Sequence, residues 1–156
     1  MDKQRRIFLK HSLATGAITF AVASGLLMPR RILAAWPKEA FEATDATTAL
    51  KILLGEGQPK TSRNILLKTT TSMSVAGPEV TVVVSTEIPG IDSIALIVPG
   101  NRKPLAAAFR LGAETPGFIK TRIKMDASGD LKVVVKAQDR MYSLAQNIDL
   151  SGCGCS

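Results

Sequence analysis

The residues of this chain best suited to chemistry are its two cysteines, Cys153 and Cys155, in the final segment Gly-Cys-Gly-Cys-Ser. Gly152 and Gly154 lack Cβ atoms, so the backbone around the first thiol can enter a narrow space. Free cysteine usually packs as a small hydrophobic side chain, and terminal residues are poorly ordered unless other contacts fix them. The pattern indicates reactive thiols on a flexible arm, residues 151–156. The alternative interpretation is a frayed tail with an incidental cysteine pair.

The Cys-Gly-Cys spacing leaves two kinds of chemistry open. The thiolate is the attacking form of cysteine, so Cys153 could carry a group covalently. Cysteines one residue apart do not readily reach relaxed disulfide geometry, so we expect a bond between Cys153 and Cys155 to be strained and easily reduced. The two thiolates could instead bind a soft cation such as Cu(I), although no Met or His cluster supplements them. A third possibility is a purely structural, adhesion-type domain with a dispensable tail.

The first 35 residues have the features of a removable export signal. A basic start containing Arg5 and Arg6 precedes a moderately apolar run without acidic residues, and a stretch of small residues ends at Ala35. The arginine pair and the Phe-Leu-Lys that follows closely are similar to the twin-arginine signal. We therefore expect cleavage before Trp36 and delivery to the periplasm by the twin-arginine route. The alternative is an N-terminal membrane anchor, which the serines, threonines and glycines of the apolar run disfavour.

Removal of this leader changes the functional classes that the composition allows. Six of the 20 basic residues and one of the 13 acidic residues lie in residues 1–35, so the remainder carries 14 basic against 12 acidic side chains. This near balance gives no electrostatic footprint for nucleic acid. The one histidine, His11, also leaves with the signal. Without it the mature chain has no Ser-His or Cys-His nucleophile pair and no His-ligated metal, which argues against an ordinary hydrolase.

Residues 36–150 have the length of one domain with one hydrophobic core. The segment 37–54 predicts a helix, or two short helices because of the threonine-rich middle, with Gly55 as its end. From residue 65 onward the pattern changes to short β-branched runs separated by Pro, Gly and Asn turns. The expected strands are Ile65–Thr69, Glu79–Thr86, Ile91–Val98, Leu105–Leu111, Phe118–Met125, Leu131–Ala137 and Met141–Leu150.

Seven short strands without intervening helices predict a mainly β fold, an immunoglobulin-like antiparallel β-sandwich preceded by a short N-terminal helix. The run 119–125 alternates apolar with basic residues, as expected for a sheet with one wet face. The continuous runs Val82-Val83-Val84 and Val133-Val134-Val135 instead indicate strands covered on both faces, by the opposite sheet and by a helix or a partner.

The leader, body and tail together resemble the SoxY family, the sulfur-carrier subunits of the bacterial thiosulfate-oxidising Sox system. The family tail reads Gly-Gly-Cys-Gly-Gly, so its carrier cysteine falls on Cys153. Here Ser151 replaces the first glycine, Cys155 replaces the last, and Ser156 is one residue extra. The body segments that carry the resemblance are Trp36–Phe41, Ile88–Leu96, Pro104–Phe109 and Thr121–Met125.

The resemblance implies a carrier rather than an enzyme, with no cofactor, no metal and no membrane anchor after processing. Cys153 would hold thiosulfate-derived sulfur covalently while partner enzymes act on it in turn. The expected partners are a SoxZ-like subunit in a heterodimer, a c-type cytochrome that conjugates thiosulfate to the thiol, a hydrolase that releases sulfate and, as an open alternative, a sulfane dehydrogenase. Cys155 departs from the family pattern, and it is either inert or an auxiliary thiol that attacks a persulfide on Cys153.

Overall fold

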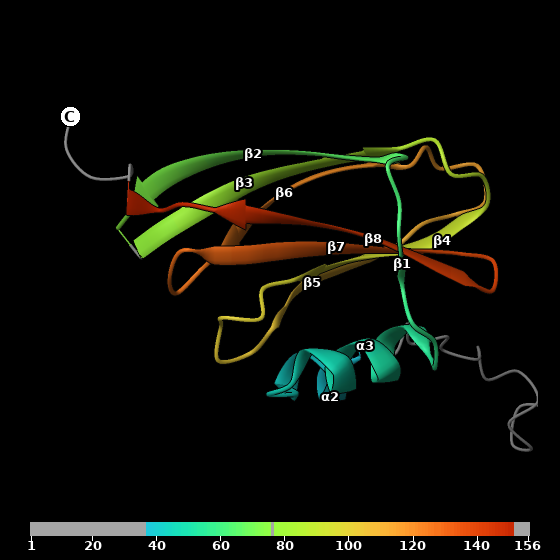
Figure 1. The fold of residues 1–156 in the computed structure, drawn as a ribbon, viewed down its shortest axis with the longest axis horizontal. Helices are drawn as coiled ribbons and strands as arrows, with labels where there is room; N and C mark the ends of the chain where they lie inside the picture. The colour runs from blue at the N-terminus through green and yellow to red at the C-terminus, as the bar shows by residue number, and fades with distance from the viewer. Residues whose placement is uncertain (1–36, 76, 152–156) are drawn as a thin grey trace, which may run out of the picture. The chain divides into compact units, whose positions relative to one another are not determined.

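The computed structural model describes residues 37–75 and 77–151. Two short helices precede the strands in this part of the chain (Figure 1). The elements are α2 (Lys38–Glu42), α3 (Ala46–Leu54), β1 (Lys60–Thr61), β2 (Ile65–Ser74), β3 (Gly77–Thr86), β4 (Ile91–Ile97), β5 (Leu105–Arg110), β6 (Phe118–Lys124), β7 (Gly129–Ala137) and β8 (Arg140–Ile148).

The strands form two sheets that pack face to face, with the helices as a third layer. The larger sheet has the order β1-β8-β7-β4-β5 and the smaller one the order β2-β3-β6. All pairs are antiparallel except β1 with β8, which is parallel. Figure 1 shows α2 and α3 on the face of the larger sheet that points away from the smaller sheet. The prediction of an antiparallel sandwich preceded by a short helical segment is confirmed.

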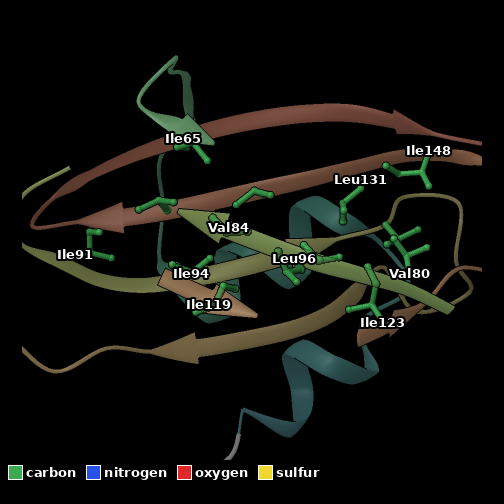
Figure 2. Close-up of a cluster of buried hydrophobic side chains, with 14 of the residues drawn as sticks. Ile65, Val80, Val84, Ile91, Ile94, Leu96, Ile119, Ile123, Leu131 and Ile148 are labelled. Atoms are coloured by element: carbon green, nitrogen blue, oxygen red, sulfur yellow. The ribbon is translucent and has the colours of Figure 1, made fainter. Parts of the chain in front are cut away.

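The main core lies between the two sheets and consists mostly of buried aliphatic side chains of β2, β3, β4, β6, β7 and β8, with half-buried residues of β5 packed against them (Figure 2). Val80, Val82 and Val84 of β3 are fully buried there, opposite Ile94 and Leu96 of β4. Alternate residues of these strands face the same side because side chains along a strand point to opposite faces. This alternation fixes the pairing register, since a slip of one residue would move the apolar set into solvent.

The two valine runs have different surroundings. Val133 and Val135 face the core between the sheets, whereas Val134 is buried against α2 and α3 in a second cluster with Ala40 and Ala49. The prediction that this strand is covered on both faces is therefore confirmed, and the second cover is the chain's own helices. For β3 no described helix covers the outer face, and cover of this strand by a partner stays a prediction.

Only alternate residues of β3 are fully buried. Val83 is half-buried on the outer face of the smaller sheet, where its register partners are Lys68 and Lys120. Long aliphatic stems of lysine can cover a valine in this way without a further layer.

The helical segment breaks into two helices, as the threonine-rich middle suggested. Ala43 has extended backbone angles and ends α2, and Asp45 caps α3 by accepting a hydrogen bond from the Thr48 N–H at 2.8 Å. The same backbone hydrogen bond is the main reason that the pKa of Asp45 is lowered. Gly55 follows the last helical residue with a φ of 92°, which glycine adopts without strain. Its predicted role as the end of the helix is confirmed.

All seven expected strands are present, with bounds that differ by at most two residues except at the end of β2. β2 continues five residues past its expected end, to Ser74, because it remains paired with β3 as far as Gly77. The two-residue β1 was not expected from the sequence. In the described residues 37–75 and 77–151, no helix is long and apolar enough to cross a membrane.

Candidate functional site

The residues singled out for chemistry lie outside the described part of the chain. This holds for Cys153 and Cys155, for their glycine neighbours, and for Arg5 and Arg6 of the expected export signal. The expected cleavage site before Trp36 also lies outside it. Their assigned roles stay predictions. The structure does describe the residues that connect the cysteine segment to the sandwich, Asp149 to Ser151, here called the arm base.

The arm base emerges at one end of the sandwich, here called the arm end. Because these strands pair antiparallel within each sheet, β2, β4, β6 and β8 finish at this end and β3, β5 and β7 begin there (Figure 1). Figure 1 shows the end of β8 beside the end of β2 and the beginning of β3. The surface around the arm base is therefore built from turns that join strands of both sheets.

The arm base is fastened to the sandwich by its own hydrogen bonds. The Leu150 N–H donates to Ser128 Oγ at 2.9 Å, and Ser128 Oγ donates to Asp149 Oδ1 at 3.3 Å. The same Asp149 oxygen accepts the Ser151 N–H at 2.8 Å. Just before this segment Ile148 is buried in the main core, and Leu150 packs against that core while half-exposed. The chain is thus held in place as far as Ser151.

The electrostatics of the arm base favour an ionised Asp149. Hydrogen bonds from the Ser151 side chain, the Ser151 backbone N–H and the Ser128 hydroxyl lower the pKa of this carboxyl. Hydrogen bonds to the charged form of an acid always act in this direction. A carboxylate therefore stands four residues before Cys153, and its negative charge does not assist thiolate formation. Activation of that thiol requires groups other than this carboxylate.

The loop between β4 and β5 is joined to the end of β6 by a small polar network. Asn101 Nδ2 donates to the Lys124 carbonyl oxygen at 2.8 Å, and Asn101 Oδ1 accepts the Asp126 N–H at 2.9 Å. The Arg102 N–H donates to Asp126 Oδ2 at 3.3 Å. These bonds connect the two sheets at the arm end. The β4–β5 loop is consequently fixed to the end of β6.

A metal site and an active-site pocket each place requirements on the rest of the described surface. Among residues 37–75 and 77–151, no three His, Cys, Asp or Glu side chains gather where they could hold a metal ion. An open hollow of about 530 Å³ lies between α3, the segment after it, Lys132 of β7 and Met141 of β8. Its charged lining includes the ion pair Lys51–Glu56 at 2.7 Å, whose side chains are both mostly exposed. An exposed pair of this kind contributes little energy and does not mark an active site.

The sequence reasoning missed the residues that hold the arm base. Ser128 and Asp149 are 21 positions apart and meet only because β7 and β8 form a hairpin. The local signal was the Asp149-Leu150-Ser151 segment, since Asp commonly accepts a hydrogen bond from the backbone two residues ahead. That pattern could have indicated a fixed turn immediately before the cysteine segment.

The chain is similar to known proteins in sequence and in fold. A protein-family model described as "Sulfur oxidation protein SoxY" matches residues 49–155, which include the cysteine segment as far as Cys155. The solved structure of the sulfur carrier protein SoxY from Chlorobium limicola f thiosulfatophilum is 27% identical, with a TM-score of 0.60 over 74% of this chain and 99% of that one.

A superoxide reductase (neelaredoxin) from Ignicoccus hospitalis E23A is 13% identical, with a TM-score of 0.46 over 68% of this chain and 88% of that chain. At that level the similarity supports no conclusion. No curated protein matches the chain.

Proposed function

Because the chain belongs to the SoxY family, we propose that it is a sulfur carrier of the Sox system that holds thiosulfate-derived sulfur covalently on Cys153. The observation that carries the proposal is the family match, which runs through the sandwich and into the Gly-Cys-Gly segment directly after the arm base. The similarity to a SoxY carrier of known structure, over 99% of that chain, supports it further.

The proposed loading step is an oxidative conjugation. The Cys153 thiol loses its proton, its sulfur bonds to the sulfane sulfur of thiosulfate, and two electrons leave to a c-type cytochrome, giving Cys–S–S–SO₃⁻. Water then attacks the sulfonate sulfur, and sulfate departs with cleavage of the S–S bond to it, leaving a persulfide on Cys153. Both steps use catalytic groups of partner enzymes, since the arm base supplies only the Asp149 carboxylate and serine hydroxyls. The chain is thus a substrate of these enzymes.

The arm base suits a carrier because it separates a rigid body from the reactive segment. Ser128 and Asp149 fix the chain as far as Ser151, and Gly152 and Gly154 flank the thiol without side-chain bulk. An active site that receives the segment therefore meets little steric resistance around the sulfur. Cys155 is proposed as an auxiliary thiol that affects the lifetime of the adduct.

The proposed setting is the periplasm, reached by the twin-arginine route through Arg5 and Arg6, with a SoxZ-like subunit as a stable partner. The twin-arginine route exports folded proteins. A partner without its own signal could therefore be exported in a folded complex with this chain. The further proposed partners are the conjugating cytochrome, the sulfate-releasing hydrolase and, as an alternative fate of the sulfane sulfur, a sulfane dehydrogenase.

Intact-mass measurement of the processed protein tests the carrier proposal. The reduced protein is incubated with thiosulfate and the conjugating cytochrome, and a sample alkylated beforehand with iodoacetamide serves as the blocked control. The proposal expects a thiosulfate adduct that appears only in the unblocked sample. An unmodified protein that instead takes up one Cu(I) through its thiols would refute carriage and support a metal-binding module.

A further inference from the structure

Two large apolar side chains at the arm end of the sandwich are exposed in the described structure. Met73, near the end of β2, is 60% exposed, and Val75, in the turn that follows, is fully exposed. Together they are here called the apolar rim. Scattered exposed apolar residues are ordinary, so exposure alone decides nothing about the rim. The position of the rim at the arm end is the observation that indicates a function.

The rim lies at the end of the sandwich from which the arm base emerges. β2 and β8 belong to different sheets and approach each other where Gln146 Nε2 contacts Thr69 Oγ1 at 3.4 Å. From this contact both strands run toward the arm end (Figure 1). Met73 is four residues beyond Thr69, and Leu150 is four residues beyond Gln146. The rim and the arm base therefore both lie at the arm end of the sandwich.

The reach of the sulfur is short. The six residues 151–156 would span roughly 20 Å if extended, at about 3.3 Å per residue. Cys153, however, is only two residues beyond Ser151, which is fastened to Asp149. Two residue steps place its Cα at most about 7 Å from that of Ser151. An enzyme whose reactive group meets the Cys153 sulfur must therefore bring the mouth of its active site against the arm end.

From this constraint we propose that the apolar rim, Met73 and Val75, is a docking contact for the cytochrome that conjugates thiosulfate to Cys153, and that it packs against an apolar surface at the mouth of that enzyme's active site. The inference rests on the proposed carrier function, because only a thiol that is processed by other proteins needs such docking. A short tether and a contact surface beside it act together: the contact holds the thiol at the mouth and raises its effective concentration there.

The test compares the double substitution Met73→Ser and Val75→Ser with the matched control Leu66→Ser in the processed full-length carrier. Leu66 is 63% exposed and lies at the other end of the same strand, about 23 Å from Met73 at roughly 3.3 Å per residue. Loading of thiosulfate onto Cys153 by the conjugating cytochrome is followed by peptide mass. Alkylation of Cys153 by iodoacetamide, which needs no docking, is measured in parallel.

At limiting carrier concentration we expect the double variant to be loaded about tenfold more slowly than the wild type, because its KM is higher. A tenfold change corresponds to about 1.4 kcal/mol of binding free energy. The Leu66→Ser control should load at the wild-type rate, and all variants should be alkylated equally fast. Loading of the double variant at the wild-type rate would overturn the inference while the carrier function stands. Failure of wild-type Cys153 to load at all would refute the carrier function, and the docking role with it.

A second variant separates docking from indirect effects on the arm. Six Gly and Ser residues inserted between Ser151 and Gly152 lengthen the tether, so the sulfur reaches an active site without close contact of the rim. In this background the double substitution should slow loading much less than tenfold. An undiminished tenfold loss with the longer tether would contradict a docking role for the rim.

Discussion

Replacement of Gly117 by alanine should destabilise the sandwich by about 2–4 kcal/mol. Gly117 precedes β6, and its carbonyl oxygen accepts the Thr86 N–H at 2.8 Å. A Cβ at this position would lie 2.5 Å from the Thr86 carbonyl oxygen and 2.5 Å from Ile91 Cδ1. Ordinary contacts begin near 3.4 Å, so the two backbones would have to separate by most of an ångström. Overpacking of this kind costs about 1–3 kcal/mol, and weakening of the Thr86 hydrogen bond adds about 1 kcal/mol.

The matched control is Gly129→Ala at the start of β7. A Cβ on Gly129 would meet nothing within 4 Å, and its φ is not in the left-handed region. We expect its free energy of unfolding to change by less than about 0.5 kcal/mol. The assay is urea unfolding of the processed protein, with the slope of the transition unchanged between variants. If Gly117→Ala unfolds within about 0.5 kcal/mol of the wild type, the close backbone approach derived from the structure is wrong.

Three further predictions concern the arm base, export and assembly. Because the pKa of Asp149 lies below its ordinary value of 3.8, its hydrogen bond to Ser151 should be complete above that value and be lost as the pH falls through the lowered pKa. The Ser151 amide shift in an NMR titration should report this change, and in an Asp149→Asn variant the change should be absent. Replacement of Arg5 and Arg6 by lysine should leave an uncleaved precursor in the cytoplasm; a processed periplasmic form would contradict the export proposal. Sedimentation of the processed chain with the SoxZ-like subunit should show a stable complex that buries more than about 1,200 Å² in total; two independently sedimenting monomers would contradict it.

The sequence was informative about the strands that form the core. β-branched runs between Pro and Gly turns identified β4 and β7, because their apolar residues pack between layers and leave a strong local pattern. The second half of β2, with Thr70 and Ser72 facing outward, carries no such pattern. It is a strand only because β3 pairs with it along its whole length. Likewise, the two residues of β1 are ordered by their parallel pairing with β8, a tertiary contact without a local signal.

The functional residues also include some that the sequence alone indicates and some that only the fold brings together. The thiol Cys153 stands out from the sequence by residue type, glycine neighbours and position, so no fold is needed to find it. The arm base is different, since Ser128 meets Asp149 only through strand pairing. The apolar rim also depends on the fold. Met73 is of the same residue type as the fully buried Met125, so residue type alone does not indicate that Met73 is 60% exposed.

Mass mapping of the C-terminal tryptic peptide, Met141–Ser156, tests the central claim most directly. The wild type, Cys153→Ser and Cys155→Ser are each incubated with thiosulfate and the conjugating cytochrome, and the peptide is fragmented to locate the adduct. The account predicts sulfur on Cys153 in the wild type, retained loading in Cys155→Ser and none in Cys153→Ser, because an alcohol cannot form the persulfide or thiosulfonate linkage. Loading that survives Cys153→Ser and disappears in Cys155→Ser would contradict the account and assign the carrier role to Cys155.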